Sequence, residues 1–129
     1  MSIALFFITH EGIASSLLAT GENILQKTNN NLSFHEIPMD APVDKMIDEI
    51  KNKLSQLTSG HGYLFITDAF GSTPGNIAQQ LATEYKAPLI SGVNLPMVIR
   101  LLNYRNENIE TLVDKALDGA HMGIQQHKT

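Results

Sequence analysis

The chain has 129 residues, 43% of them hydrophobic and 17% charged, which is enough apolar sequence for a single globular domain over residues 1–129. With 9 basic and 13 acidic residues the net charge is −4, and no cluster of lysine and arginine is present, so we expect no nucleic-acid partner. The absence of cysteine excludes disulfides, thiolate metal ligands and a cysteine nucleophile.

The first half of the chain predicts two strands and two helices. Ile3–Ile8 is continuously apolar, which is typical of a strand buried on both faces. This run is too short to cross a bilayer and no basic segment precedes it, so we expect a cytoplasmic protein that does not insert into the membrane. Apolar residues then recur at helical spacing over 13–25. Leu32–Ile37 mixes polar and apolar residues and predicts a strand near a sheet edge, and an amphipathic helix follows over 43–57.

The second half continues the alternation. Gly62–Thr67 is apolar and aromatic and predicts a third strand, and the short run Pro88–Ser91 predicts a fourth. Helical patterns follow at three places, two of them opened by a proline, which suits a first helical turn: 74–85, 96–102 and 109–117.

Strands that begin about 30 residues apart, with helices between them, predict an α/β fold with an open, mainly parallel sheet and helices on both faces. Ligand sites in such sheets lie at the carboxyl ends of strands where the winding reverses. If the chain winds outward from the first strand to the second and then crosses back, the first and third strands are neighbours. His10 and Asp68, which end those strands, would then meet.

A histidine and an aspartate at such a point suggest a specific chemistry. The carboxylate can accept a hydrogen bond from Nδ1–H, which leaves the Nε2 lone pair free to act as a base, to bind a metal or to attack an electrophile. The alternative is that His10 packs at a strand end and Asp68 caps a turn, and the residues alone leave both interpretations open.

The segment Asp68-Ala-Phe-Gly-Ser-Thr-Pro-Gly-Asn76 follows the third strand. Gly71 permits unusual backbone angles, and Ser72 and Thr73 can cap a helix whose N-terminus would favour an anion. No nucleotide-binding glycine motif is present. The alternative is an ordinary joint between a strand and a helix.

A metal hydrolase is a rival interpretation. It would use His10, Glu11 and Asp68, but His61 precedes the third strand and should lie at the opposite end of the sheet. Too few ligands converge, so we expect no metal. The other histidines are expected to be structural or solvated: His35, His61, His121 and His127.

Three motifs together resemble the enzyme IIA domain of the mannose-type (mannose/fructose/sorbose) sugar phosphotransferase system. They are Thr9-His10 after the apolar strand, Asp68–Asn76, and Ser91-Gly-Val-Asn-Leu-Pro-Met97. The resemblance implies that His10 accepts a phosphoryl group from the phosphocarrier HPr and passes it to a IIB protein, with Asp68 orienting the histidine. It implies no cofactor. It also implies strand order 2-1-3-4, a homodimer, and an exchanged C-terminal strand drawn from 123–128.

On this basis Gly71, Ser72 and Thr73 are expected to bind the phosphoryl group. Thr9, Asn94 and Pro96 are expected to form cleft walls. Crowded apolar residues near 98–102 are a further reason to expect a dimer. Two related roles stay open: the phosphotransfer subunit for dihydroxyacetone kinase, and a regulatory protein whose phosphorylation state controls a partner.

Overall fold

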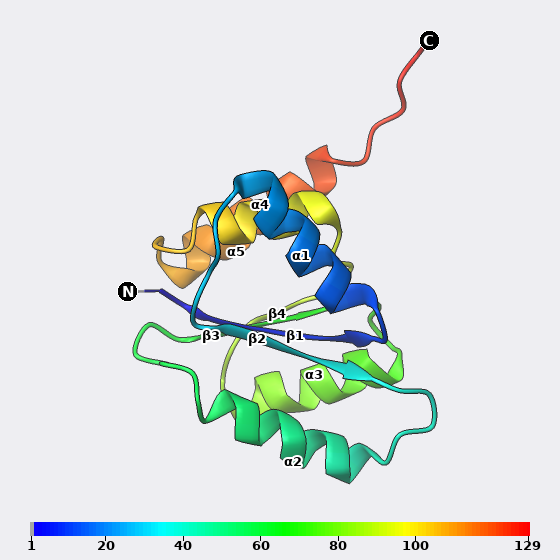
Figure 1. The fold of residues 1–129 in the computed structure, drawn as a ribbon, viewed down its shortest axis with the longest axis vertical. Coiled ribbons are helices and arrows are strands. Elements are labelled where there is room, and N and C mark those ends of the chain that lie inside the picture. Colours follow the sequence, from blue (N-terminus) through cyan, green and yellow to red (C-terminus); the bar gives the residue numbers. More distant parts are fainter. Residues whose placement is uncertain (1) are drawn as a thin grey trace.

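A computed structural model of the chain describes residues 2–129 and shows a parallel sheet of four strands, β2-β1-β3-β4, between two helical layers (Figure 1). The sequence prediction of an α/β fold with order 2-1-3-4 is confirmed. Along the chain the elements are β1 (Ala4–His10), α1 (Ile13–Leu25), β2 (Leu32–Ile37), α2 (Val43–Leu54), β3 (Tyr63–Thr67), α3 (Thr73–Glu84), β4 (Leu89–Ile90), α4 (Leu95–Asn103) and α5 (Ile109–Met122).

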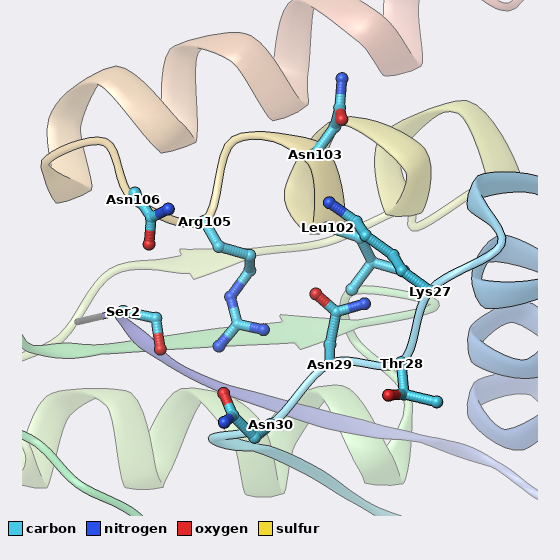
Figure 2. Close-up of a pocket in the computed structure, with 9 residues that line it drawn as sticks. All are labelled: Ser2, Lys27, Thr28, Asn29, Asn30, Leu102, Asn103, Arg105 and Asn106. Atoms are coloured by element: carbon cyan, nitrogen blue, oxygen red, sulfur yellow. The ribbon is translucent and has the colours of Figure 1, made fainter.

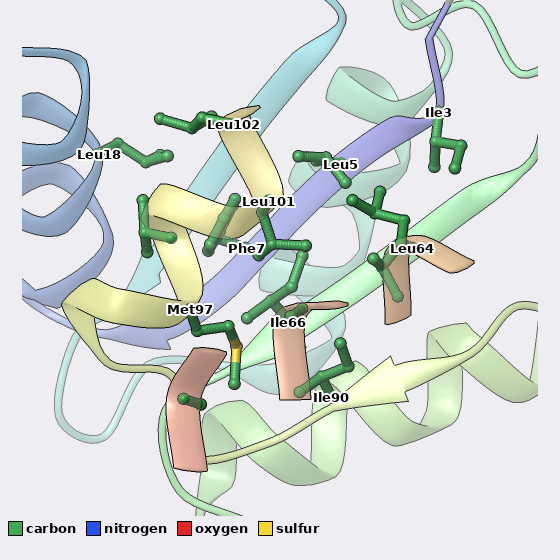
Figure 3. Packing of buried hydrophobic residues seen from close by; sticks show 14 of the residues in the cluster. Ile3, Leu5, Phe7, Leu18, Leu64, Ile66, Ile90, Met97, Leu101 and Leu102 are labelled. Atoms are coloured by element: carbon green, nitrogen blue, oxygen red, sulfur yellow. The ribbon is translucent and has the colours of Figure 1, made fainter. Parts of the chain in front are cut away.

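Alternate residues of the central strand serve two separate cores, as the strand period requires. Leu5 and Phe7 face α1, α4 and α5, where Met97 and Leu101 pack against them (Figure 3). Phe6 and Ile8 face the other way, into the core covered by α2 and α3. All four of these β1 side chains are fully buried, which accounts for the uninterrupted apolar run in the sequence.

The winding of the chain reverses between β1 and β3, which places the carboxyl ends of these strands side by side. Both strands run parallel, and the register pairs Ile8 with Thr67. The residues that follow this pair therefore meet at the same edge of the sheet. β2 is an edge strand, as its mixed composition predicts, because it pairs with β1 alone.

The resemblance to the IIA family predicts that the C-terminal segment forms a strand exchanged between two subunits. Residues 124–129 follow α5 as an exposed segment without strand structure, and it leads away from the body of the molecule (Figure 1). An exchanged strand drawn from this segment stays a prediction. Within residues 2–129, no helix is both long and apolar enough to cross a membrane.

Candidate functional site

His10 and Asp68 are in direct contact at the carboxyl edge of the sheet. His10 Nδ1 lies 2.7 Å from Asp68 Oδ2, and the backbone N–H of His10 donates to the same oxygen at 3.1 Å. The His10 side chain remains 42% exposed, whereas that of Asp68 is 15% exposed. A mostly buried carboxylate thus holds a histidine whose other ring nitrogen, Nε2, is available for reaction.

The surroundings of Asp68 keep it ionised. Burial on its own raises the pKa of Asp68, but the hydrogen bonds from the His10 side chain and from the backbone N–H groups of His10 and Ala69 outweigh burial, so the pKa lies below its usual value. Its second oxygen, Oδ1, accepts from Ala69 N–H at 3.0 Å. An ionised carboxylate only accepts hydrogen bonds, so the neutral His10 ring takes the tautomer with its proton on Nδ1 and the lone pair on Nε2.

The turn from β1 into α1 fixes the position of His10. The fully buried Thr9 donates its hydroxyl to the backbone carbonyl of His10 at 2.8 Å and accepts from Ala14 N–H at 3.1 Å. Gly12, at φ +84°, then reverses the chain in a conformation that favours glycine. Thr9 was predicted as a cleft wall, and the structure places it beneath the histidine.

Glu36 supports the same turn from β2, and sequence reasoning missed it. Its carboxylate accepts from the Ser15 backbone N–H at 2.8 Å and from the Ser15 hydroxyl at 2.6 Å, which caps the first turn of α1. Burial raises the pKa of Glu36, but these hydrogen bonds prevail and lower it. The polar alternation of the edge strand was the available signal.

The loop after β3 leads into α3 through the predicted Gly-Ser-Thr segment. Gly71 adopts φ +87°, and Ser72 caps α3 by accepting from Gly75 N–H at 3.3 Å while donating to the Ala69 carbonyl at 2.6 Å. Thr73 is the first residue of α3. Gly75 is required by packing, since a Cβ there would lie 2.5 Å from the Ala69 carbonyl oxygen.

A small cavity of about 230 Å³ adjoins His10, and Thr73 and Pro74 form part of its wall. The opposite wall is the loop after β2, which contains Asp40 in a left-handed conformation at φ +59°. Sequence reasoning did not identify this loop as part of the site. The signal was topological, because a strand that pairs with β1 in parallel must deliver its following loop to the same edge.

Asn94 and Pro96, the other predicted cleft walls, join α4 to the end of α5. Asn94 caps α4 by accepting from Met97 N–H at 3.0 Å, and it donates to the Ala120 carbonyl at 3.2 Å. Pro96 packs so closely on Gly123 that a Cβ on that glycine would lie 2.4 Å away. Neither residue lines the cavity beside His10.

The other histidines lie apart from His10. His61 lies near Ser2 at the amino edge of the sheet, and His35 pairs with Glu49 at 3.2 Å. His121 is in α5 and His127 is in the exposed terminal segment. Across residues 2–129, no three histidine, aspartate or glutamate side chains are grouped so as to hold a metal ion.

Exposed apolar side chains occur on the segments that follow β1, β2 and β3. Met39 is 81% exposed and Phe70 is 66% exposed, and Ile13 and Val43 are also exposed. Their segments all begin at the carboxyl edge that carries His10. We call these four residues the apolar rim. Such a surface beside a shallow site is suited to contact with another protein.

The fold and the site define a small α/β domain with an aspartate-oriented, exposed histidine at the switch point of a parallel sheet. The family model "PTS system fructose IIA component" (EIIA-man) matches residues 4–117, and the chain belongs to this family of phosphotransferase-system IIA components.

Named relatives agree with this assignment. The PTS system mannose-specific EIIAB component of Escherichia coli K12 is 28% identical over 131 residues, which is 99% of this chain and 40% of that protein. The chain thus spans less than half the length of that relative. The PTS system fructose-specific EIIA component of Bacillus subtilis is 30% identical over 64 residues, which is 49% of this chain and 44% of that protein.

Solved structures share the fold. The mannose/sorbose-specific IIA subunit of Enterococcus faecalis superposes with a TM-score of 0.86 at 18% identity, over 100% of this chain and 97% of that one. The phosphotransferase system component EIIA of Streptococcus agalactiae superposes with a TM-score of 0.81 at 22% identity, over 96% of each chain.

Proposed function

We propose that this protein carries a phosphoryl group on Nε2 of His10, accepts it from phosphorylated HPr, and passes it to a IIB protein. The observation that carries the proposal is the 2.7 Å contact between His10 Nδ1 and the ionised Asp68. That contact sets the tautomer in which Nε2 has a free lone pair, on a ring exposed enough for a protein donor to reach.

The proposed step is a displacement at phosphorus. The Nε2 lone pair of His10 forms a bond to phosphorus while the bond from phosphorus to the donor's histidine nitrogen breaks, and the donor nitrogen keeps that electron pair. Positive charge develops on the His10 ring, and the carboxylate of Asp68 at Nδ1 stabilises it. Transfer to IIB is the same step in reverse, with His10 as the leaving group.

Transfer of a phosphoryl group depends mainly on positioning and on stabilisation of its negative charge, and little on further covalent chemistry by the protein. At the N-terminus of α3, the turn Gly71–Thr73 brings Thr73, with its backbone N–H and hydroxyl, to the cavity that His10 lines, while the Ser72 N–H donates to the Ala69 carbonyl at 3.3 Å. A helix N-terminus favours negative charge. We assign the phosphoryl oxygens to this turn.

The apolar rim is proposed as the docking surface for both protein partners. A histidine in a cavity of about 230 Å³ has no deep pocket for a sugar, whereas a protein surface can reach it. Donor and acceptor would use the same rim in turn, because both must place a nitrogen in line with Nε2. Sugar choice would therefore rest with other components.

The test is phosphorylation by purified HPr, its upstream kinase and phosphoenolpyruvate, followed by measurement of acid-labile phosphate per chain. The wild type should take up one phosphoryl group, and His10→Gln should take up none. His121→Gln is the matched control, because it removes an exposed histidine from α5, and it should match the wild type. Undiminished labelling of His10→Gln would overturn the proposal.

The acceptor is tested separately. When the protein phosphorylated on His10 is mixed with a IIB protein, the phosphoryl group should move to the IIB protein. If His10 accepts phosphate but no IIB protein of the mannose type discharges it, the regulatory role becomes the better account.

A further inference from the structure

A polar pocket lies at the amino edge of the sheet (Figure 2), whereas His10 lies at the carboxyl edge. It has a volume of about 390 Å³ and lies between the loop after α1, the end of α4 and the loop that carries Arg105. Arg105 donates to the carbonyl of Ile3, and Ile3 precedes His10 by seven residues of extended chain, or about 23 Å. The pocket is thus separate from the phosphoryl site.

Arg105 is the main feature of this pocket. It is only 7% exposed, and its Nη2 donates to the carbonyls of Ile3 at 2.8 Å and Asn31 at 3.1 Å, so it ties together the starts of β1 and β2. Its Nε–H is buried and finds no hydrogen-bond acceptor within residues 2–129. None of the carboxylates in that range forms an ion pair with it.

A buried cation without a counter-charge is costly, and so is a buried N–H without an acceptor. Burial lowers the pKa of Arg105, in keeping with this unfavourable setting, although the guanidinium stays charged. A positioned anion would offset both costs at once. The carbonyl contacts of Nη2 hold the guanidinium in place.

A second buried donor lines the same pocket. The side-chain Nδ2 of Asn29 is buried and has no acceptor within the described part of the chain. The carboxylate of Glu22 accepts from the backbone N–H of Asn29 at 3.0 Å, so it holds the loop rather than supplying the missing acceptor. The exposed Lys27 adds a positive charge to the pocket lining, which contains no acidic residue.

We infer that this pocket binds a small oxyanion, the carboxylate or phosphate group of a small molecule, through Arg105 and Asn29, with Lys27 contributing charge. The pocket selects for a negatively charged group with several hydrogen-bond acceptors. It offers two donors without acceptors and a buried guanidinium, and its lining contains no carboxylate. Because the pocket lies at the opposite edge from His10, the ligand does not compete with phosphoryl transfer, and the inference stands whether or not His10 is the phosphoryl acceptor.

The test is an NMR titration of the full chain at constant ionic strength, with sodium phosphate, sodium acetate or sodium chloride. The Nε–H of Arg105 and the side-chain amide of Asn29 report directly on the site. We expect saturable shifts at both groups with phosphate or acetate below about 10 mM, and none with chloride. The tighter of the two oxyanions identifies the ligand's acidic group. Shifts that fail to saturate, or that chloride reproduces, would overturn the inference.

Two variants fix the location. Asn29→Asp places a carboxylate in the pocket and should abolish the response to phosphate, whereas Asn52→Asp, with the same charge change on the exposed side of α2, should keep it. Lys27→Gln should weaken binding several-fold and leave phosphorylation of His10 unchanged. A phosphate response that persists in Asn29→Asp would refute the assignment to this pocket.

Discussion

Replacing Asp68 with asparagine tests how the site orients its histidine. Each oxygen of Asp68 accepts hydrogen bonds: Oδ2 from the backbone and ring of His10, and Oδ1 from Ala69 N–H. An asparagine has one accepting oxygen and one donating nitrogen. No orientation of the amide can therefore reproduce both sets of contacts.

The two orientations have different consequences. With its nitrogen toward His10, the amide faces the backbone N–H of His10 and requires Nδ1 to accept, which moves the ring proton to Nε2 and blocks attack. With its nitrogen toward Ala69, the amide still accepts from Nδ1–H of His10 and so keeps the reactive tautomer. Its NH₂ group then faces the Ala69 N–H, so two donors oppose each other. The negative charge that stabilises the developing imidazolium is also lost. The second orientation sets the smallest loss that we expect.

The magnitude follows from the hydrogen bonds involved. A hydrogen bond to a charged group contributes about 1.5–3 kcal/mol, compared with about 0.5–1.5 kcal/mol for a neutral pair. The difference, about 1–1.5 kcal/mol, corresponds to a loss of about tenfold in rate. We expect at least this loss in the rate of phosphoryl transfer to Asp68→Asn.

The assay is rapid-quench transfer from phosphorylated HPr, with circular dichroism to confirm that the variant folds. Asp48→Asn makes the same charge change on the exposed face of α2 and should transfer at the wild-type rate. If folded Asp68→Asn transferred phosphate as fast as the wild type, Asp68 would be a turn residue only, and the proposed role of its charge would be refuted.

Three further outcomes are expected. Because the pKa of Asp68 is lowered in the folded state, its contribution to stability is complete above its unfolded pKa of about 3.9 and is lost as the pH falls through the lower folded value. The difference in unfolding free energy between the wild type and Asp68→Asn, from urea titrations, should therefore shrink below about pH 4; a constant difference would contradict this. Gly75→Ala should lower the unfolding free energy by about 1–3 kcal/mol because its Cβ meets the Ala69 carbonyl, whereas Gly60→Ala, with open space around it, should change it by less than about 1 kcal/mol. The protein should be a dimer by light scattering, and Ile124→Glu, at a side chain that is 76% exposed beyond α5, should weaken the dimer; a monomeric wild type at micromolar concentration would count against it.

The sequence predicted the strands of the sheet well because the hydrophobic pattern of each strand is a local property of the sequence. The apolar run of β1 and the alternation of β2 distinguish a central strand from an edge strand, and the structure confirms both. The helix expected over 43–57 ends earlier, at Leu54, where Ser55 and the following residues form a turn. Helix ends depend on capping contacts, which the hydrophobic pattern does not encode.

The site was predictable where topology alone decides it. His10 and Asp68 meet because they end neighbouring parallel strands. The loop after β2 reaches the site by the same topology, because β2 pairs with β1 in parallel. The contribution of Glu36 depends on its side-chain contact with Ser15, and no motif marks that contact.

The sequence argument for dimer formation from residues 98–102 is wrong in its physical basis. Val98, Leu101 and Leu102 are buried in the chain's own core. Met122 and Ile124 are exposed apolar side chains near the C-terminus, and the dimer stays a prediction.

The central claim, that Nε2 of His10 carries the phosphoryl group while Nδ1 is held by Asp68, is tested most directly by nitrogen-resolved NMR. The protein, labelled with ¹⁵N-histidine and phosphorylated by HPr, would be examined for coupling between ³¹P and each ring nitrogen. The account predicts phosphorus bonded to Nε2 of His10, with Nδ1 protonated. Phosphorus on Nδ1 of His10, or on any other residue, would contradict it.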